Sequence, residues 1–148
     1  MVKQQVWQFA KSYQELKIAE TKDTIKKVQE SGNNEQKSSM GDKYETARAM
    51  SQNEIYMLSQ QLEVLQQEYQ KLLRIQPDKP CMIGELGALV QTETSTCFIA
   101  AAIGSLNIEN QKIAIISEQS PLAKALLKKK IGEKIELAGK SIKILNIL

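Results

Sequence analysis

The sequence of 148 residues contains no histidine and only two cysteines. The absence of histidine excludes Ser-His-Asp and Cys-His nucleophilic chemistry, a histidine general base and histidine-ligated zinc. Two cysteines are too few for a four-thiolate metal site. Cys81 and Cys97 have no visible activating base in the sequence, so we predict that they are reduced thiols in the core.

Long apolar runs and a strong excess of one charge are also missing. The longest apolar run, 97–103, is far shorter than a membrane span, and the N-terminal residues contain no secretory apolar core. We therefore expect a cytoplasmic protein without membrane contact. The net charge is +3, which is too small for a protein that wraps DNA by charge alone.

The composition changes near residue 77. Residues 1–76 contain no proline and most of the aromatic residues, which leaves them free to form long helices. The rest of the chain holds all three prolines and most of the glycines, a pattern typical of short strands and turns. We predict a helical hairpin at 1–76, a linker at 77–80 and a second domain at 81–148, because neither Pro77 nor Pro80 fits inside a helix.

Apolar residues recur at alternating steps of three and four in the second half of the predicted hairpin. This stripe comprises Tyr44, Ile55, Leu58, Leu62, Leu65, Tyr69 and Leu72, with Arg48 and Ser51 in the remaining slots. It predicts a coiled-coil seam. The first half shows a set that shifts register, namely Val2, Val6, Phe9, Tyr13 and Leu16, then Ile18, Ile25 and Val28. Two such helices bury their stripes on each other as an antiparallel pair; a dimerising coiled coil or a bundle element is the alternative.

The tip of this hairpin is expected at about 31–45. Gly32 and Asn33 would end the first helix, and Ser38 or Ser39 would cap the second. Two acidic residues, Asp42 and Glu45, then fall three apart in the first turn of the second helix, on one face. The helix dipole favours acidic residues there, so this placement also has a purely structural explanation.

Residues 81–148 predict a small α+β domain. A serine followed by proline, Ser120-Pro121, is the preferred start of a helix. Gly139 lies in a tight turn between two short apolar runs. The predicted strands are 84–93 and 96–103 as a hairpin, 112–116 as a single strand, and 134–137 and 141–145 as a closing hairpin.

Two stretches carry recognisable motifs. One runs from Ile116 to Ile135 and contains Ser-Pro-Leu-Ala-Lys-Ala-Leu-Leu followed by a lysine-rich turn with a glycine. The other is Gly41-Asp42-Lys43-Tyr44-Glu45, at the predicted hairpin tip. Together they resemble the GreA/GreB transcript-cleavage factors of bacterial RNA polymerase, which carry Gly-Asp-x-x-Glu at the tip. The order of parts agrees along essentially the whole chain.

The resemblance implies a fold and a mechanism. The fold would be α+β, an N-terminal antiparallel α-helical coiled-coil hairpin and a small FKBP-like antiparallel β domain with one short helix. The C-terminal domain would dock on the rim of the polymerase secondary channel, and the tip would reach the active site. Asp42 and Glu45 would help hold Mg²⁺ for hydrolysis of backtracked RNA at its 3′ end. If the Ser- and Asn-rich flank of this chain builds a different tip, Glu35 is a third candidate acid.

Magnesium chemistry is compatible with a chain that lacks histidine. Mg²⁺ keeps several waters and is typically held by one or two carboxylates, and metal-activated water needs no side-chain base. The polymerase would have to supply the rest of the site, so the chain would not be an enzyme by itself. We expect a monomer. The candidate partner-binding residues are Ser120, Pro121, Lys124, Lys128, Lys129 and Lys130. The lysine run could meet an acidic polymerase surface or nucleic acid, although such a run is more often a solvated turn.

Departures from the family pattern leave other functions open. Residues 33–40 are rich in Ser and Asn where the family continues in helix, and Glu45 is not followed by the family's Asn-Ala-Glu-Tyr run. A channel-binding regulator without cleavage activity is therefore the second hypothesis, and a coiled-coil interaction protein unrelated to polymerase is the third. Prolyl isomerase activity is disfavoured because 81–148 contains one aromatic residue, Phe98.

Overall fold

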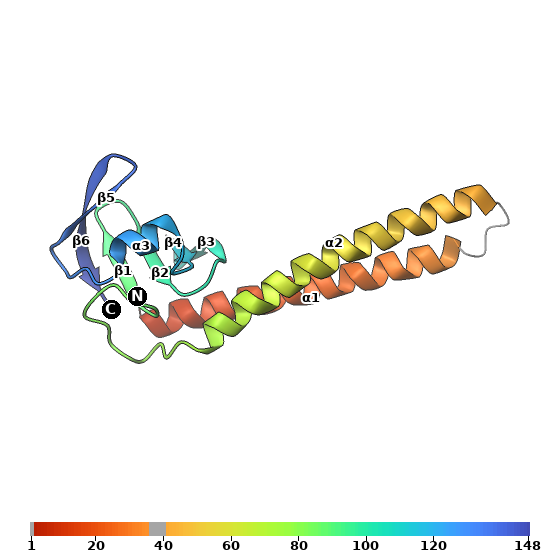
Figure 1. Ribbon diagram of the computed structural model, residues 1–148. Helices are drawn as coiled ribbons and strands as arrows, with labels where there is room; N and C mark the ends of the chain where they lie inside the picture. The colour runs from red at the N-terminus through yellow and green to blue at the C-terminus, as the bar shows by residue number, and fades with distance from the viewer. Residues whose placement is uncertain (1, 36–40) are drawn as a thin grey trace. The chain divides into compact units, whose positions relative to one another are not determined.

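A computed structural model describes residues 2–35 and 41–148, with the backbone alone at 33–35 and 41–44. Two long helices precede a β domain that contains one short helix (Figure 1), which confirms the predicted α+β class. The elements in order are α1 (Lys3–Glu35), α2 (Gly41–Leu73), β1 (Leu89–Thr92), β2 (Thr96–Ile99), β3 (Gly104–Ile108), β4 (Gln111–Ile116), α3 (Pro121–Leu126), β5 (Lys134–Leu137) and β6 (Lys140–Ile147).

The chain divides into two compact units. One unit consists of Gln14–Gln67, and the other combines Met1–Tyr13 with Glu68–Leu148. Within the first unit the two helices run antiparallel, since Gln14 hydrogen-bonds Leu65 at one end and Gly32 approaches Ser51 at the other. The predicted seam of α2 is confirmed over 51–65, because its inward positions there are half-buried; they are Ser51, Ile55, Leu58, Leu62 and Leu65. Arg48, predicted in the same seam, is exposed, and the Tyr44 side chain lies outside the described residues.

The register predicted for the first half of α1 is wrong. Val2, Phe9 and Leu16 are 61%, 45% and 58% exposed, so they do not belong to the inward stripe. That stripe has no break and consists of Val6, Ala10, Gln14, Ile18, Thr21, Ile25, Val28 and Gly32, each buried or half-buried. The continuity of this stripe is not evident in the sequence, because the inward residue Gln14 is polar. Its side chain is 2% exposed, and Nε2 donates to the Leu65 carbonyl at 2.9 Å, which satisfies the buried amide.

The sheet has six strands in the order β3-β4-β2-β1-β6-β5. The predicted hairpins β1–β2 and β5–β6 are confirmed as antiparallel pairs. The prediction that the sheet is antiparallel throughout is wrong, because β2 and β4 pair in parallel. The cause is β3, a strand that the sequence reasoning missed. It lies beyond β4 and pairs with it antiparallel, so the chain returns along β4 in the direction of β2.

Each face of the sheet packs on a different helical partner, because side chains alternate along a strand. On one face Phe98 packs in a cluster with Val6 of α1 and Leu72 of α2. On the other face Cys97 and its neighbours pack with Leu126 of α3. The Trp7 indole donates to the Leu72 carbonyl at 2.8 Å. The sheet domain therefore includes the first turns of α1 and the last turns of α2.

The two cysteines are free and buried, as predicted. Burial raises the pKa of the Cys97 thiol from 9.0 to about 12, and burial is also the main cause that raises the pKa of Cys81. Raised thiol pKa values oppose reactivity, because the thiolate is the nucleophile.

We therefore expect a maleimide reagent at pH 8 to leave both thiols of the native protein unmodified and to modify both after unfolding in guanidinium. Mass spectrometry counts the modified thiols. Equal labelling rates in native and unfolded protein would contradict this burial.

Because folding raises the pKa of Cys97, the free energy of unfolding should fall as pH rises from about 9 toward 12.

Candidate hairpin tip and polymerase-docking surface

The backbone at the end of the helical pair supports part of the predicted tip. Helix α1 continues through Gly32 and Asn33 to Glu35, so the prediction that these residues end it is wrong. Helix α2 begins at Gly41. The predicted caps Ser38 and Ser39 lie outside the described residues.

The candidate acids occupy the start of α2. Positions 42 and 45 both lie in its first turns and are about 4.5 Å apart along the axis, on one side of the helix. The Glu45 side chain is exposed. The side chains of Asp42 and Glu35 lie outside the described residues, so their assignment stays a prediction.

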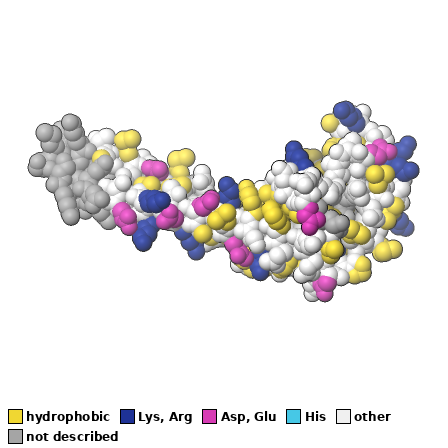
Figure 2. Space-filling view, turned by 180° about the vertical axis from the view of Figure 1, so that it is seen from behind, with side chains coloured by type: hydrophobic (Ala, Val, Ile, Leu, Met, Phe, Trp, Pro, Cys, Tyr) yellow, Lys and Arg dark blue, Asp and Glu magenta, His cyan; other side chains and the backbone are white. Residues whose placement is uncertain are grey.

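A hollow of about 340 Å³ opens between the helices close to these positions. It is lined by Val28, Gln29, Gly32, Arg48, Ser51, Gln52 and Ile55. Arg48 follows Glu45 by three positions and is exposed. Elsewhere on this unit both charge signs intermingle on the surface (Figure 2), and Lys27 pairs with Asp23 at 3.0 Å. Exposed pairs of this kind describe an ordinary solvated helix surface.

Carboxylate oxygens suit Mg²⁺, yet the donor number on this chain is small. Among the side chains that the structure describes, no group of three or more His, Cys, Asp or Glu could hold a metal ion. Two carboxylates would leave most of the coordination shell to water or to another molecule. The donor chemistry at 42 and 45 therefore fits magnesium only as part of a site that a partner completes.

The Ser-Pro motif builds the start of α3, as the sequence predicts. Ser120 is the N-cap, and its Oγ accepts a hydrogen bond from the Ala123 N–H at 3.2 Å. Pro121 follows in the first turn and is exposed. Ser120 thus has a structural task in the cap, while Pro121 and Lys124 present exposed surface.

The lysine run forms a tightly held loop after α3, which we call the basic loop, residues 128–130. The Lys128 N–H donates to the Gly84 carbonyl at 2.8 Å, and the Gly84 N–H donates to the Lys129 carbonyl at 2.9 Å. Lys128 has a φ of 65°. The side chains of Lys128 and Lys130 are exposed and that of Lys129 is half-buried. The loop therefore presents two lysines on a fixed backbone.

Apolar side chains accompany the basic loop. Ile83 and Lys130 form an antiparallel bridge, so their neighbours Met82 and Ile131 lie opposite each other across it. These two side chains are 79% and 53% exposed. Figure 2 shows Lys, Arg and apolar side chains on the surface of the sheet domain. An exposed apolar pair beside lysines is a surface suited to protein contact.

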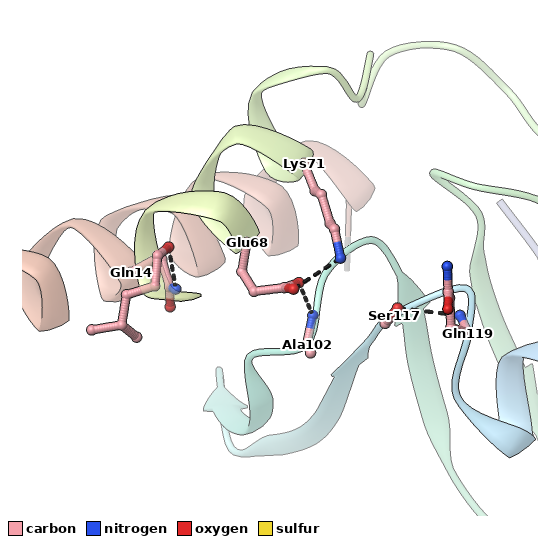
Figure 3. Close-up of polar contacts among 7 residues, drawn as sticks. Gln14, Glu68, Lys71, Ala102, Ser117 and Gln119 are labelled. Atoms are coloured by element: carbon pink, nitrogen blue, oxygen red, sulfur yellow. Dashed lines mark hydrogen bonds and ion pairs between the residues drawn. The ribbon is translucent and has the colours of Figure 1, made fainter. Parts of the chain in front are cut away.

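Sequence reasoning missed a polar anchor at the end of α2. The Glu68 carboxylate accepts hydrogen bonds from the Ala102 N–H at 2.7 Å and from Lys71 at 2.8 Å (Figure 3). The Glu68 side chain is only 13% exposed. Its sequence position indicates this burial only weakly: Glu68 lies three residues after Leu65 and four before Leu72, which places it on the seam side of α2.

No helix within the described part of the chain combines the length and apolar character that a membrane crossing requires.

Residues 101–148 match the family model described as transcription elongation factor, GreA/GreB, C-term. This range includes the start of α3 and the basic loop. A solved structure of the transcription factor Gfh1 is similar at 16% identity, over 93% of this chain and 92% of that one, with a TM-score of 0.37. No curated protein matches the sequence.

Proposed function

We propose that the chain is an elongation factor that stimulates RNA cleavage by bacterial RNA polymerase, because residues 101–148 match the GreA/GreB C-terminal family model. It would act in the cytoplasm as a monomer and bind the polymerase at its secondary channel. The family match is the observation that carries the proposal. The carboxylates at the start of α2 supply its chemical part.

Docking is the task of the C-terminal domain. Pro121, Lys124, Lys128 and Lys130 are exposed, and Met82 and Ile131 add apolar contact area. Fixed lysines beside an apolar pair fit an acidic partner surface with an apolar centre. The hydrogen bonds that hold the basic loop on Gly84 keep this surface ordered before binding, which lowers the entropic cost of docking.

Completing the metal site is the task of the hairpin tip. Each long helix has 33 residues, about 50 Å at 1.5 Å per residue, so the pair can carry the acids deep into a channel. A magnesium ion held jointly with the polymerase would supply an activated water for hydrolysis. Glu45 and Asp42 would contribute negative oxygen ligands, and RNA phosphate and polymerase carboxylates would contribute the others.

The proposal is tested on arrested elongation complexes that contain 3′-backtracked, end-labelled RNA. The purified chain should shorten this RNA in the presence of magnesium and not in the presence of EDTA, while the complexes alone shorten it slowly. Polymerase binding without shortening would support the channel-binding regulator instead. Failure to bind polymerase in a pull-down would leave a coiled-coil interaction protein.

Reversing charge on the basic loop should weaken docking. Lys128→Glu with Lys130→Glu replaces two exposed lysines on a fixed loop, and we expect about a tenfold weaker affinity for polymerase, with a smaller dependence on salt. The matched control is Lys112→Glu, an exposed lysine on β4, which should bind within about twofold of the parent. Fluorescence anisotropy at two salt concentrations measures both. Equal affinities for the two variants would remove the basic loop from the docking surface.

A further inference from the structure

Neighbouring strands place a row of neutral polar side chains on one face of the sheet. Gln91 of β1 lies in register with Thr96 of β2 and with Asn146 of β6. Gln111 of β4 joins the row, because its Nε2 donates to the Thr96 hydroxyl at 3.0 Å. The row therefore crosses the strands β4-β2-β1-β6 in sheet order, about 14 Å at the usual strand spacing.

This row forms the wall of a pocket. Gln91, Thr96, Gln111 and Asn146 line a hollow of about 190 Å³ together with Leu89 and Leu148, so we call it the amide pocket. Leu89 packs in the core on the face that carries Phe98, whereas α3 packs on the opposite face with Cys97. The amide pocket is thus separate from the α3 start and from the basic loop.

The lining restricts the chemistry of a ligand. None of the side chains that line the amide pocket is charged or aromatic. A phosphate, carboxylate or metal ion would find no side chain of opposite charge there, and a nucleobase would find no ring on which to stack. Three primary amides and one hydroxyl instead offer donors and acceptors in one row, and two leucines offer apolar contact.

The amides retain hydrogen-bonding capacity beyond the contacts they make inside the protein. A primary amide has two N–H donors and an oxygen with two acceptor sites. Gln111 uses one donor on Thr96, and the Asn146 oxygen accepts from the Ile147 N–H at 3.0 Å, which orients its NH₂ group. Exposed Gln91 lies between them in the row.

We propose that the amide pocket binds an uncharged ligand through a planar amide, pairing donor with acceptor on Gln91 and Asn146 while Leu89 and Leu148 contact its apolar part. Peptide bonds and carboxamides share this chemistry. Ligand binding in the amide pocket is independent of polymerase docking, so a negative result for this ligand would leave the proposed function unaffected.

The test is a titration of the ¹⁵N-labelled chain, followed by heteronuclear NMR, with two probes that differ in one group. N-acetylglycinamide carries a terminal amide, and N-acetylglycine carries a carboxylate in its place. We expect saturable shifts at residues 89–91, 96, 111 and 146–148 with the amide probe and at least fivefold weaker binding of the carboxylate probe. Adenosine, the third probe, should bind no better than the carboxylate.

Variants show whether the polar row causes the binding. Gln91→Leu and Asn146→Leu alter exposed side chains, and each should weaken the amide probe about fivefold, the value of one hydrogen bond. Gln70→Leu, an exposed glutamine on α2, is the matched control and should bind as the parent does. Equal binding of the two acetylglycine probes, preference for adenosine, or no saturable shift would each overturn the proposal.

Discussion

The Asp42→Asn, Glu45→Gln double variant is expected to bind RNA polymerase as tightly as the parent and to lose about 100-fold in RNA cleavage rate. Both changes keep the size of the side chain and remove its negative charge, which a magnesium ligand requires. Both positions lie at the start of α2, and the Glu45 side chain is exposed. Rates come from single-turnover cleavage of arrested complexes, and affinities come from anisotropy.

The matched control carries the same loss of charge farther along the same helix. Glu54→Gln and Glu63→Gln alter exposed residues of α2, and together they should leave cleavage within about twofold of the parent. If the control pair lost cleavage equally, net charge of the hairpin would explain the effect. Parental cleavage by the double variant would show that Asp42 and Glu45 are not the functional acids.

Gly84→Ala should destabilise the sheet domain by about 3 kcal/mol or more. A Cβ at this position would lie 1.9 Å from the Leu126 carbonyl oxygen, and backbone cannot move away as a side chain can. To relieve this clash, residue 84 would have to move away from the basic loop, and its hydrogen bonds to Lys128 and Lys129 would break. Fluorescence of the single tryptophan, Trp7, in a urea titration reports the loss, because it packs in this domain.

Gly32→Ala is the matched control for this substitution. Gly32 lies inside α1, and a Cβ there would meet the Ser51 side chain at 3.4 Å, an ordinary contact. Alanine favours helix over glycine by up to about 1 kcal/mol, so far-UV circular dichroism should show unchanged or increased stability. An unchanged urea midpoint for Gly84→Ala would contradict the close approach of Gly84 to α3.

The sequence predicted those helices whose pattern depends only on residues within the helix itself. The seam of α2 follows from the spacing of Ile55, Leu58, Leu62 and Leu65, because a 3.5-residue period is read along one helix. The start of α3 follows from Ser120 and Pro121, because capping depends on residues within one turn. The family motif coincides with this same helix and the loop after it, and both lie within the residues that the family model matches.

Features that depend on distant partners were not predictable in this way. Gln14 reads as a surface residue until the Leu65 carbonyl is placed opposite it, and Glu68 reads likewise until Ala102 is placed. The short strand β3 has two buried residues, Leu106 and Ile108, too few for a clear alternation. The amide pocket depends on strand order, which no single strand encodes.

Site-directed crosslinking is the most direct test of the proposed action of the start of α2 at the RNA 3′ end inside the polymerase. Both native cysteines are buried, so a photoreactive maleimide will attach to a cysteine introduced at exposed Ala49 or exposed Val64 of α2. The two sites are about 22 Å apart along the helix. We expect the label at 49 to crosslink the terminal nucleotides of backtracked RNA and the label at 64 to crosslink polymerase alone. Polymerase binding without an RNA crosslink from position 49 would contradict this placement of the α2 start.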